Sequence, residues 1–95
     1  MRILVVEDEP RLAALLQRGF SDEGHVVDVV GDGPNAIHRA SEYDYDAVVL
    51  DWMLPGLSGL EVCAHLRRAG CWAAIIILTA RTDVSDRIAG LDAGA

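Results

Sequence analysis

The chain has 95 residues, 52% of them hydrophobic, and a formal net charge of −7; this length suits one domain, and the hydrophobic content excludes a disordered chain. An acidic surface repels phosphate backbones and attracts divalent cations, so we expect no direct contact between this chain and nucleic acid. The apolar runs are too short to cross a bilayer and no basic segment precedes a long apolar one, which excludes a membrane protein and predicts a cytoplasmic location.

The N-terminal quarter of the chain predicts a strand followed by a helix. The β-branched run from Arg2 to Val6 is typical of a strand, and it ends abruptly at three acidic residues, Glu7, Asp8 and Glu9. From Pro10 onward, apolar residues recur at helical spacing as far as Phe20. Gly24 is a stop signal, so the helix is expected to end near Glu23.

The middle of the chain predicts a second strand and helix and then a third strand. The run from Val26 to Val30 favours a strand, and a Gly-Asp-Gly turn separates it from a helix that opens at Pro34. The run from Ala47 to Leu50 is apolar without alternation, which is typical of a parallel strand covered on both faces. Asp51 lies at the carboxyl end of this strand.

The remaining segments predict two more helices and a fourth strand. Ser58 has the spacing of a capping box with Glu61, which indicates a helix through about Arg68. A strand is expected from Ala74 to Leu78, ending at Thr79. Apolar residues between Val84 and Leu91 indicate a last helix, closed by Gly94. Strands and helices therefore alternate four times, which predicts an α/β fold with a doubly wound parallel sheet.

Polar residues at the carboxyl ends of the predicted strands indicate a ligand site, because ligands bind beyond this edge of a doubly wound sheet. Glu7 and Asp8 follow the first strand, Asp51 the third and Thr79 the fourth. If the first and third strands are neighbours, carboxylates about 4 Å apart repel by roughly 4 kcal/mol at an effective dielectric constant near 20. A Mg²⁺ ion, which prefers oxygen ligands, would offset this repulsion.

Three segments, MRILVVEDE, YDAVVLDWMLPGLSGLEV and ILTARTDVSDRIAGLDAGA, resemble the receiver domain of bacterial two-component response regulators, in the OmpR/PhoB-like branch. The resemblance runs over the whole chain in register. It implies a single receiver domain over residues 1–95 with a flavodoxin/CheY-like sheet in the strand order 2-1-3-4. It also implies a signalling domain that accepts a phosphoryl group, rather than an enzyme.

Carried over position by position, the resemblance assigns a role to each residue at the sheet edge. It implies that Glu7, Asp8, Asp51 and the backbone carbonyl of Met53 bind Mg²⁺. Asp51 is then the phosphoacceptor, which a sensor histidine kinase phosphorylates. The Thr79 hydroxyl is expected to contact the phosphoryl group.

The sequence departs from the family pattern at its C-terminus. A segment similar to ADDYLxKPF, which supplies the fifth strand and a phosphoryl-pairing lysine, would follow Ala95, and the chain contains no lysine. We therefore expect a receiver domain that lacks strand five and helix five and whose phosphorylation is slow or undetectable. We also expect a homodimer or domain-swapped oligomer, and contact with DNA only through a missing C-terminal domain.

Three other interpretations of the sequence remain open. A noncatalytic receiver-like module for dimerisation or interaction would keep the acidic pocket without phosphoryl transfer. Gly31, Gly33 and Ala36 fit a dinucleotide-binding fingerprint, although Asp32 would place negative charge beside a pyrophosphate. A phosphatase of the haloacid dehalogenase type would need a second aspartate where Met53 stands.

Overall fold

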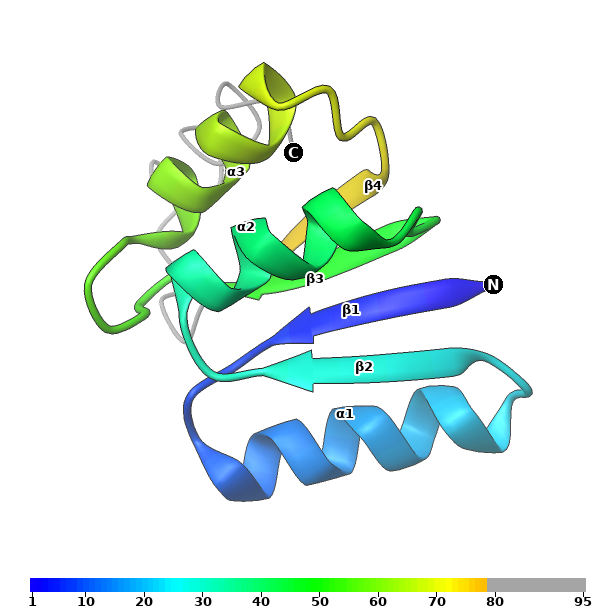
Figure 1. Cartoon of the computed structure of the whole chain (residues 1–95). Helices are drawn as coiled ribbons and strands as arrows, with labels where there is room; N and C mark the ends of the chain where they lie inside the picture. The colour runs from blue at the N-terminus through cyan, green and yellow to red at the C-terminus, as the bar shows by residue number, and fades with distance from the viewer. Residues whose placement is uncertain (79–95) are drawn as a thin grey trace.

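A computed structural model describes residues 1–78 as four strands and three helices (Figure 1). In chain order these are β1 (Arg2–Val6), α1 (Pro10–Asp22), β2 (Val26–Val30), α2 (Gly33–Glu42), β3 (Ala47–Asp51), α3 (Gly59–Arg68) and β4 (Ala74–Leu78). Every element predicted within these residues is present. The predicted site residue Thr79 and the helix between Val84 and Leu91 lie outside the described residues. No helix among residues 1–78 is long and apolar enough to span a membrane.

The four strands form one parallel sheet in the order β2-β1-β3-β4, which confirms the predicted order. At the carboxyl end of the central strand, Val6 pairs with Val30 on one side and with Leu50 on the other. β3 is one residue longer than predicted, because Asp51 pairs with Leu78 of β4. The chain adds β2 on one side of β1 and then β3 and β4 on the other side, so the direction in which strands are added changes between β1 and β3. The carboxyl ends of these two strands therefore border the expected ligand site.

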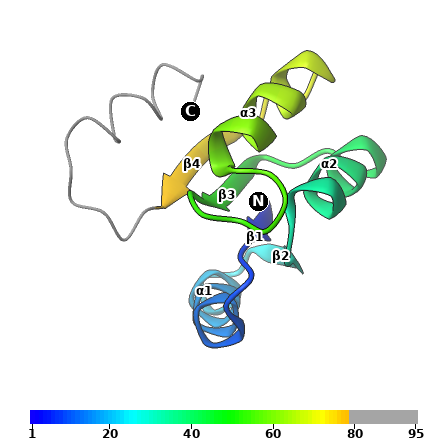
Figure 2. The same cartoon turned by 90° about the vertical axis from the view of Figure 1, so that its left-hand side faces the viewer.

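Helices cover both faces of the sheet, as the doubly wound prediction requires (Figures 1 and 2). Alternate residues of β1 enter two separate cores: Leu4 and Val6 pack on the side of α2 and α3, whereas Ile3 and Val5 pack on the side of α1. All four of these side chains are buried. This double burial explains why the central strands have no alternation of apolar and polar residues.

Local hydrogen bonds set the helix boundaries. Ser58 is the N-cap of α3, as predicted, and its hydroxyl accepts the Glu61 N–H at 3.2 Å. Gly24 ends α1 with a φ of 89°, a left-handed conformation that glycine adopts without steric cost. α2 begins one residue before the predicted Pro34, because the carboxylate of Asp32 caps the helix by accepting the Asn35 N–H at 2.8 Å.

Gly33 lies where α2 meets α3, and this position has no room for a side chain. A Cβ atom there would lie 2.7 Å from Cγ2 of Val62 and 2.9 Å from Cβ of Leu57. We expect Gly33→Ala to lower the free energy of unfolding by about 1 to 3 kcal/mol, measured by urea denaturation, because the packed core must shift. Gly31→Ala is the matched control, since nothing lies within 4 Å of its Cβ position. Equal stability of the two variants would contradict this account of the packing.

Candidate metal centre

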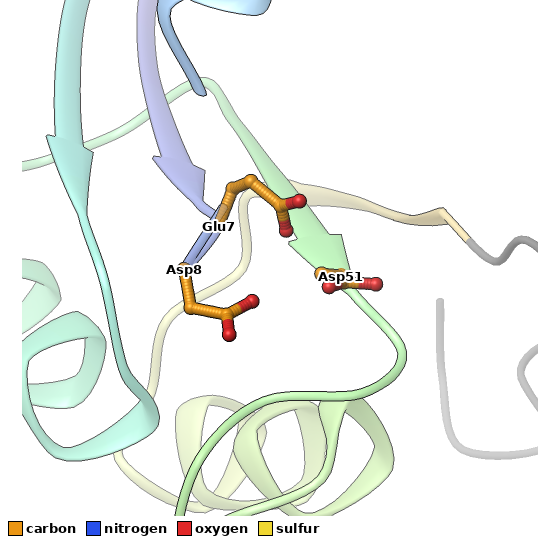
Figure 3. A group of neighbouring side chains, drawn as sticks. All are labelled: Glu7, Asp8 and Asp51. Carbon is orange, nitrogen blue, oxygen red and sulfur yellow. The ribbon is translucent and has the colours of Figure 1, made fainter. Parts of the chain in front are cut away.

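Three carboxylates from two neighbouring strands converge at one edge of the sheet (Figure 3). Glu7 and Asp8 directly follow β1, and Asp51 is the last residue of β3. One carboxylate oxygen from each of the three lies within 4.8 Å of the others. The pairing of β1 with β3 brings them together, because it places the ends of the two strands side by side. The structure thus gathers three of the site residues that the sequence placed at this edge.

The three carboxylates differ strongly in burial. Glu7 is only 5% exposed, Asp51 is partly exposed, and Asp8 is exposed. Oε2 of Glu7 is buried and has no hydrogen-bond partner among the described residues. Burial, reinforced by the neighbouring Asp51 and Asp8 carboxylates, raises the pKa of Glu7 from 4.5 to about 7. The site therefore holds a carboxyl group whose charged form is disfavoured by burial and by its acidic neighbours.

This arrangement fits a hard divalent cation such as Mg²⁺. The donor set contains only oxygen atoms, which Mg²⁺ prefers, and it includes a buried oxygen without a partner. A cation among the carboxylates would offset their repulsion and the burial of Glu7 together. The fourth predicted ligand is the backbone carbonyl of Met53, two residues beyond Asp51. The Met53 N–H lies 3.4 Å from Oδ1 of Asp51, and the carbonyl's role stays a prediction.

The backbone that follows Asp51 is held between β4 and α3. The Trp52 N–H donates to the Leu78 carbonyl at 2.7 Å, and the Gly59 N–H donates to the Trp52 carbonyl at 2.9 Å. A Cβ atom on Gly59 would lie 2.7 Å from the Asp51 carbonyl oxygen. Glycine thus lets the start of α3 approach the end of β3 closely. This role of Gly59 was not predicted from the sequence, in which the available signal was a glycine directly after the predicted Ser58 cap.

Glu9, the third residue of the acidic cluster, has a different role from its neighbours. Its carboxylate caps α1 by accepting the Arg11 N–H at 3.2 Å and the Leu12 N–H at 2.7 Å. Two free N–H groups at the helix start thus compensate the charge of Glu9. The turn between β1 and α1 is anchored at the residue that follows Glu7 and Asp8.

The glycines at the turn from β2 into α2 do not form an open phosphate cradle. The Asp32 carboxylate occupies the N-terminus of α2, and Gly33 packs against α3. A pyrophosphate would meet a negative charge at this position, which argues against the dinucleotide interpretation. Two of the histidines have contacts with other residues than the three acidic ones. His25 contacts the N-terminal amine at 3.2 Å, and His38 pairs with Glu42 at 2.6 Å.

Comparisons with known proteins converge on one family. The family model for the response regulator receiver domain matches residues 3–95. The transcriptional regulatory protein TcrA of Mycobacterium tuberculosis is 60% identical over the whole chain, which spans 38% of that protein's length. The chain therefore spans about two fifths of the length of this curated relative.

Solved structures agree with this result. A Thermotoga maritima response regulator in complex with Mg²⁺-BeF, TrrA, has a TM-score of 0.86 and 38% identity, and the match covers 98% of this chain and 81% of that one. A second neighbour is the receiver domain of a sensor histidine kinase from Pseudomonas aeruginosa, which was solved with a magnesium ion in its active-site cleft. It has a TM-score of 0.88 and 35% identity, and the match covers 98% of this chain and 78% of that one.

The buried charge of Glu7 should limit the stability of the metal-free protein. A raised carboxyl pKa means that the folded state binds this proton more tightly than the unfolded state, so the protein loses stability as the pH rises from 4.5 through about 7. Glu7→Gln removes this dependence. We expect its gain in free energy of unfolding to be near zero below pH 4.5 and to reach about 1 to 3 kcal/mol above about pH 8.

Urea denaturation in the presence of a chelator, over a series of pH values, measures this gain. The control is Asp8→Asn, which neutralises an exposed member of the same cluster and should yield a smaller gain. A Glu7→Gln variant whose advantage is the same at every pH, or that is less stable than wild type at high pH, would contradict the buried-charge account.

Proposed function

The chain belongs to the response regulator receiver domain family, and we propose that it is the phosphoacceptor domain of a two-component system in which a sensor histidine kinase phosphorylates Asp51. The observation that carries the proposal is the convergence of Glu7, Asp8 and Asp51 within 4.8 Å of one another. This site lies beyond the carboxyl ends of two adjacent parallel strands, where doubly wound folds bind ligands.

Burial and backbone hydrogen bonds support the proposal that Asp51 is the nucleophile. Glu7 is too deeply buried to meet an incoming phosphoryl group, whereas Asp51 is partly exposed. The hydrogen bonds around Trp52 fix the backbone next to Asp51, which limits the entropy lost when its side chain attacks. In the proposed step, a carboxylate oxygen of Asp51 forms a bond to phosphorus while the bond between phosphorus and the kinase histidine nitrogen breaks. The departing electron pair stays on that nitrogen.

Glu7, Asp8 and Asp51, together with the Met53 carbonyl, would hold a Mg²⁺ ion in this proposal. When bound, Mg²⁺ would neutralise negative charge on the carboxylates and on the transferred phosphoryl oxygens. The Thr79 hydroxyl, outside the described residues, would donate a hydrogen bond to a phosphoryl oxygen. In this proposal the chain at most assists its own phosphorylation, and it acts as a signalling domain rather than as an enzyme.

Phosphorylation would act as a switch through local charge. A phosphoryl group adds about −1.5 to −2 charges, and the residues that would respond to it are Thr79 and the predicted helix from Val84 to Leu91. In the whole protein, transcription regulated through a DNA-binding domain is the proposed output, because the relative TcrA is named a transcriptional regulatory protein. The cytoplasmic location expected from the sequence stays a prediction.

The noncatalytic interaction module stays the alternative to this proposal. Both functions use the same acidic pocket, and only a covalent product separates them.

Asp51→Asn tests the proposed nucleophile directly. With Mg²⁺ and a small phosphodonor such as acetyl phosphate, intact-mass spectrometry should show wild type gaining the mass of one phosphoryl group, slowly, and the variant gaining none. Asp44→Asn is the matched control, since Asp44 is an exposed aspartate of the loop before β3 and should leave phosphorylation unchanged. An equal mass gain in wild type and Asp51→Asn would remove Asp51 from this role. No gain in wild type would favour the noncatalytic module.

We also propose that this chain self-associates through β4. β4 is an edge strand of the sheet in residues 1–78, and Ile76 on this strand is 52% exposed. Apolar edge strands pair readily with another chain. Size-exclusion chromatography with light scattering should show a dimer or larger species at micromolar concentration, and Ile76→Lys should reduce it. A well-folded monomer of 10.2 kDa under these conditions would refute the proposal.

A further inference from the structure

The loop between β3 and α3 carries the one proposed metal ligand that is not a side chain, the backbone carbonyl of Met53. This loop runs from Trp52 to Ser58, and Figure 2 shows it as an open turn from the end of β3 to the start of α3. The Met53 side chain is 64% exposed, so packing contributes little to its position. The placing of its carbonyl therefore depends on the neighbouring backbone.

Two hydrogen bonds hold the backbone at the beginning of the loop. The Trp52 N–H donates to the Leu78 carbonyl of β4 at 2.7 Å, and the Trp52 carbonyl accepts the Gly59 N–H of α3 at 2.9 Å. Both polar groups of the Trp52 backbone are thus bonded to other elements. Because Trp52 stands between Asp51 and Met53, these bonds restrain the segment that carries two of the proposed ligands.

Gly59 also touches this segment directly. A Cβ atom at position 59 would lie 2.7 Å from the Asp51 carbonyl oxygen and 3.1 Å from Cα of Trp52. Among the glycines of residues 1–78, this is the one whose Cβ atom would meet backbone rather than a side chain. The φ of Gly59 is not positive, so a side chain is excluded by the close approach and not by the backbone conformation.

The rest of the loop is held by other contacts. Leu54 and Leu57 are partly buried against the core between the sheet and helices α2 and α3. The Leu57 N–H donates to the Pro55 carbonyl at 3.0 Å, which closes a tight turn around Gly56. These contacts do not involve Gly59. The effect of Gly59 is therefore confined to the first residues of the loop, next to the acidic site.

From its contact with the Asp51 carbonyl and its hydrogen bond to Trp52, we propose that Gly59 is a positioning residue of the metal centre. It sets where Asp51 and the Met53 carbonyl stand relative to the carboxylates that follow β1. The inference rests on the proposed function, because it takes these groups as Mg²⁺ ligands. A side chain at position 59 would push apart the start of α3 and the Asp51 backbone. Mg²⁺ requires near-ideal octahedral geometry, so a small displacement of its ligands weakens binding.

Gly59→Ala tests this role, with Mg²⁺ alone as the probe. Mg²⁺ is titrated into the 95-residue protein, and heteronuclear NMR follows the backbone amides of Glu7, Asp8 and Asp51. We expect the variant to bind Mg²⁺ about tenfold more weakly than wild type, because groups that orient metal ligands typically contribute this much to affinity. Phosphorylation by acetyl phosphate, measured by intact mass, should require correspondingly more Mg²⁺ in the variant.

Val62→Ala is the matched control for a loss of stability. Val62 is a fully buried residue of the same helix, and it packs in the core on the side of α2 rather than against the Asp51 backbone. Its truncation should lower the urea midpoint and leave the Mg²⁺ affinity within about twofold of wild type. A Gly59→Ala variant that loses stability but binds Mg²⁺ as well as Val62→Ala does would show that Gly59 is only structural, and would overturn the proposal.

Hydrogen exchange on the metal-free wild type decides the question if circular dichroism shows that Gly59→Ala does not fold. The positioning role requires that the contacts of Trp52 and Gly59 exist before the metal binds. Both amides should therefore exchange at least about tenfold more slowly than unprotected amides. Exchange of the Gly59 amide at the unprotected rate would overturn the proposal, because the segment would then not be held in advance.

Failure of this inference is distinguishable from failure of the proposed function. Equal Mg²⁺ affinity of wild type and Gly59→Ala overturns the positioning role alone. A wild type that binds Mg²⁺ but gains no phosphoryl group contradicts the phosphoacceptor function, while the comparison of Mg²⁺ affinities still decides the role of Gly59. A wild type that binds no Mg²⁺ overturns the metal centre and the positioning role together.

Discussion

The structure depends on one constraint, the parallel pairing of β1 with β3, which forces acidic residues at the ends of both strands into the same small volume. Glu7 bears most of the cost because it is buried and its Oε2 has no partner among residues 1–78. A fold that served stability alone would replace this carboxylate with an apolar side chain. The buried carboxyl group therefore supports the proposal of a cation at this site, which would compensate it.

Much of the fold could be predicted because its signals are local. The strands are short apolar runs, and glycine or a capping side chain marks several helix boundaries, such as Gly24 and Ser58. The strand order needed more than local signals. It came from the resemblance to the receiver family, since the pairing of β1 with both β2 and β3 depends on contacts between distant segments.

The parts that the sequence did not reveal depend on three-dimensional proximity. Nothing in the run of three acids distinguishes buried Glu7 from Glu9, which caps a helix, because that difference arises only once β1 and α1 take their directions. The contact between Gly59 and the Asp51 carbonyl joins residues of different elements. The network of Arg2, Asp28 and Tyr45 links three separate segments and could not be read from spacing.

The parallel topology also gives the two edges of the sheet opposite electrostatic character. Each helix starts near the carboxyl edge and ends near the amino edge, because each connects one parallel strand to the next. Helix N-termini at the carboxyl edge favour the carboxylate of Glu9 and would favour the oxygens of a phosphoryl group. Helix carboxyl ends at the opposite edge favour cations, and Arg39 and Arg67 already occupy the last turns of α2 and α3. Because all the helices run in the same direction, one edge of the sheet favours anions and the opposite edge favours cations. The two edges are separated by the length of a strand.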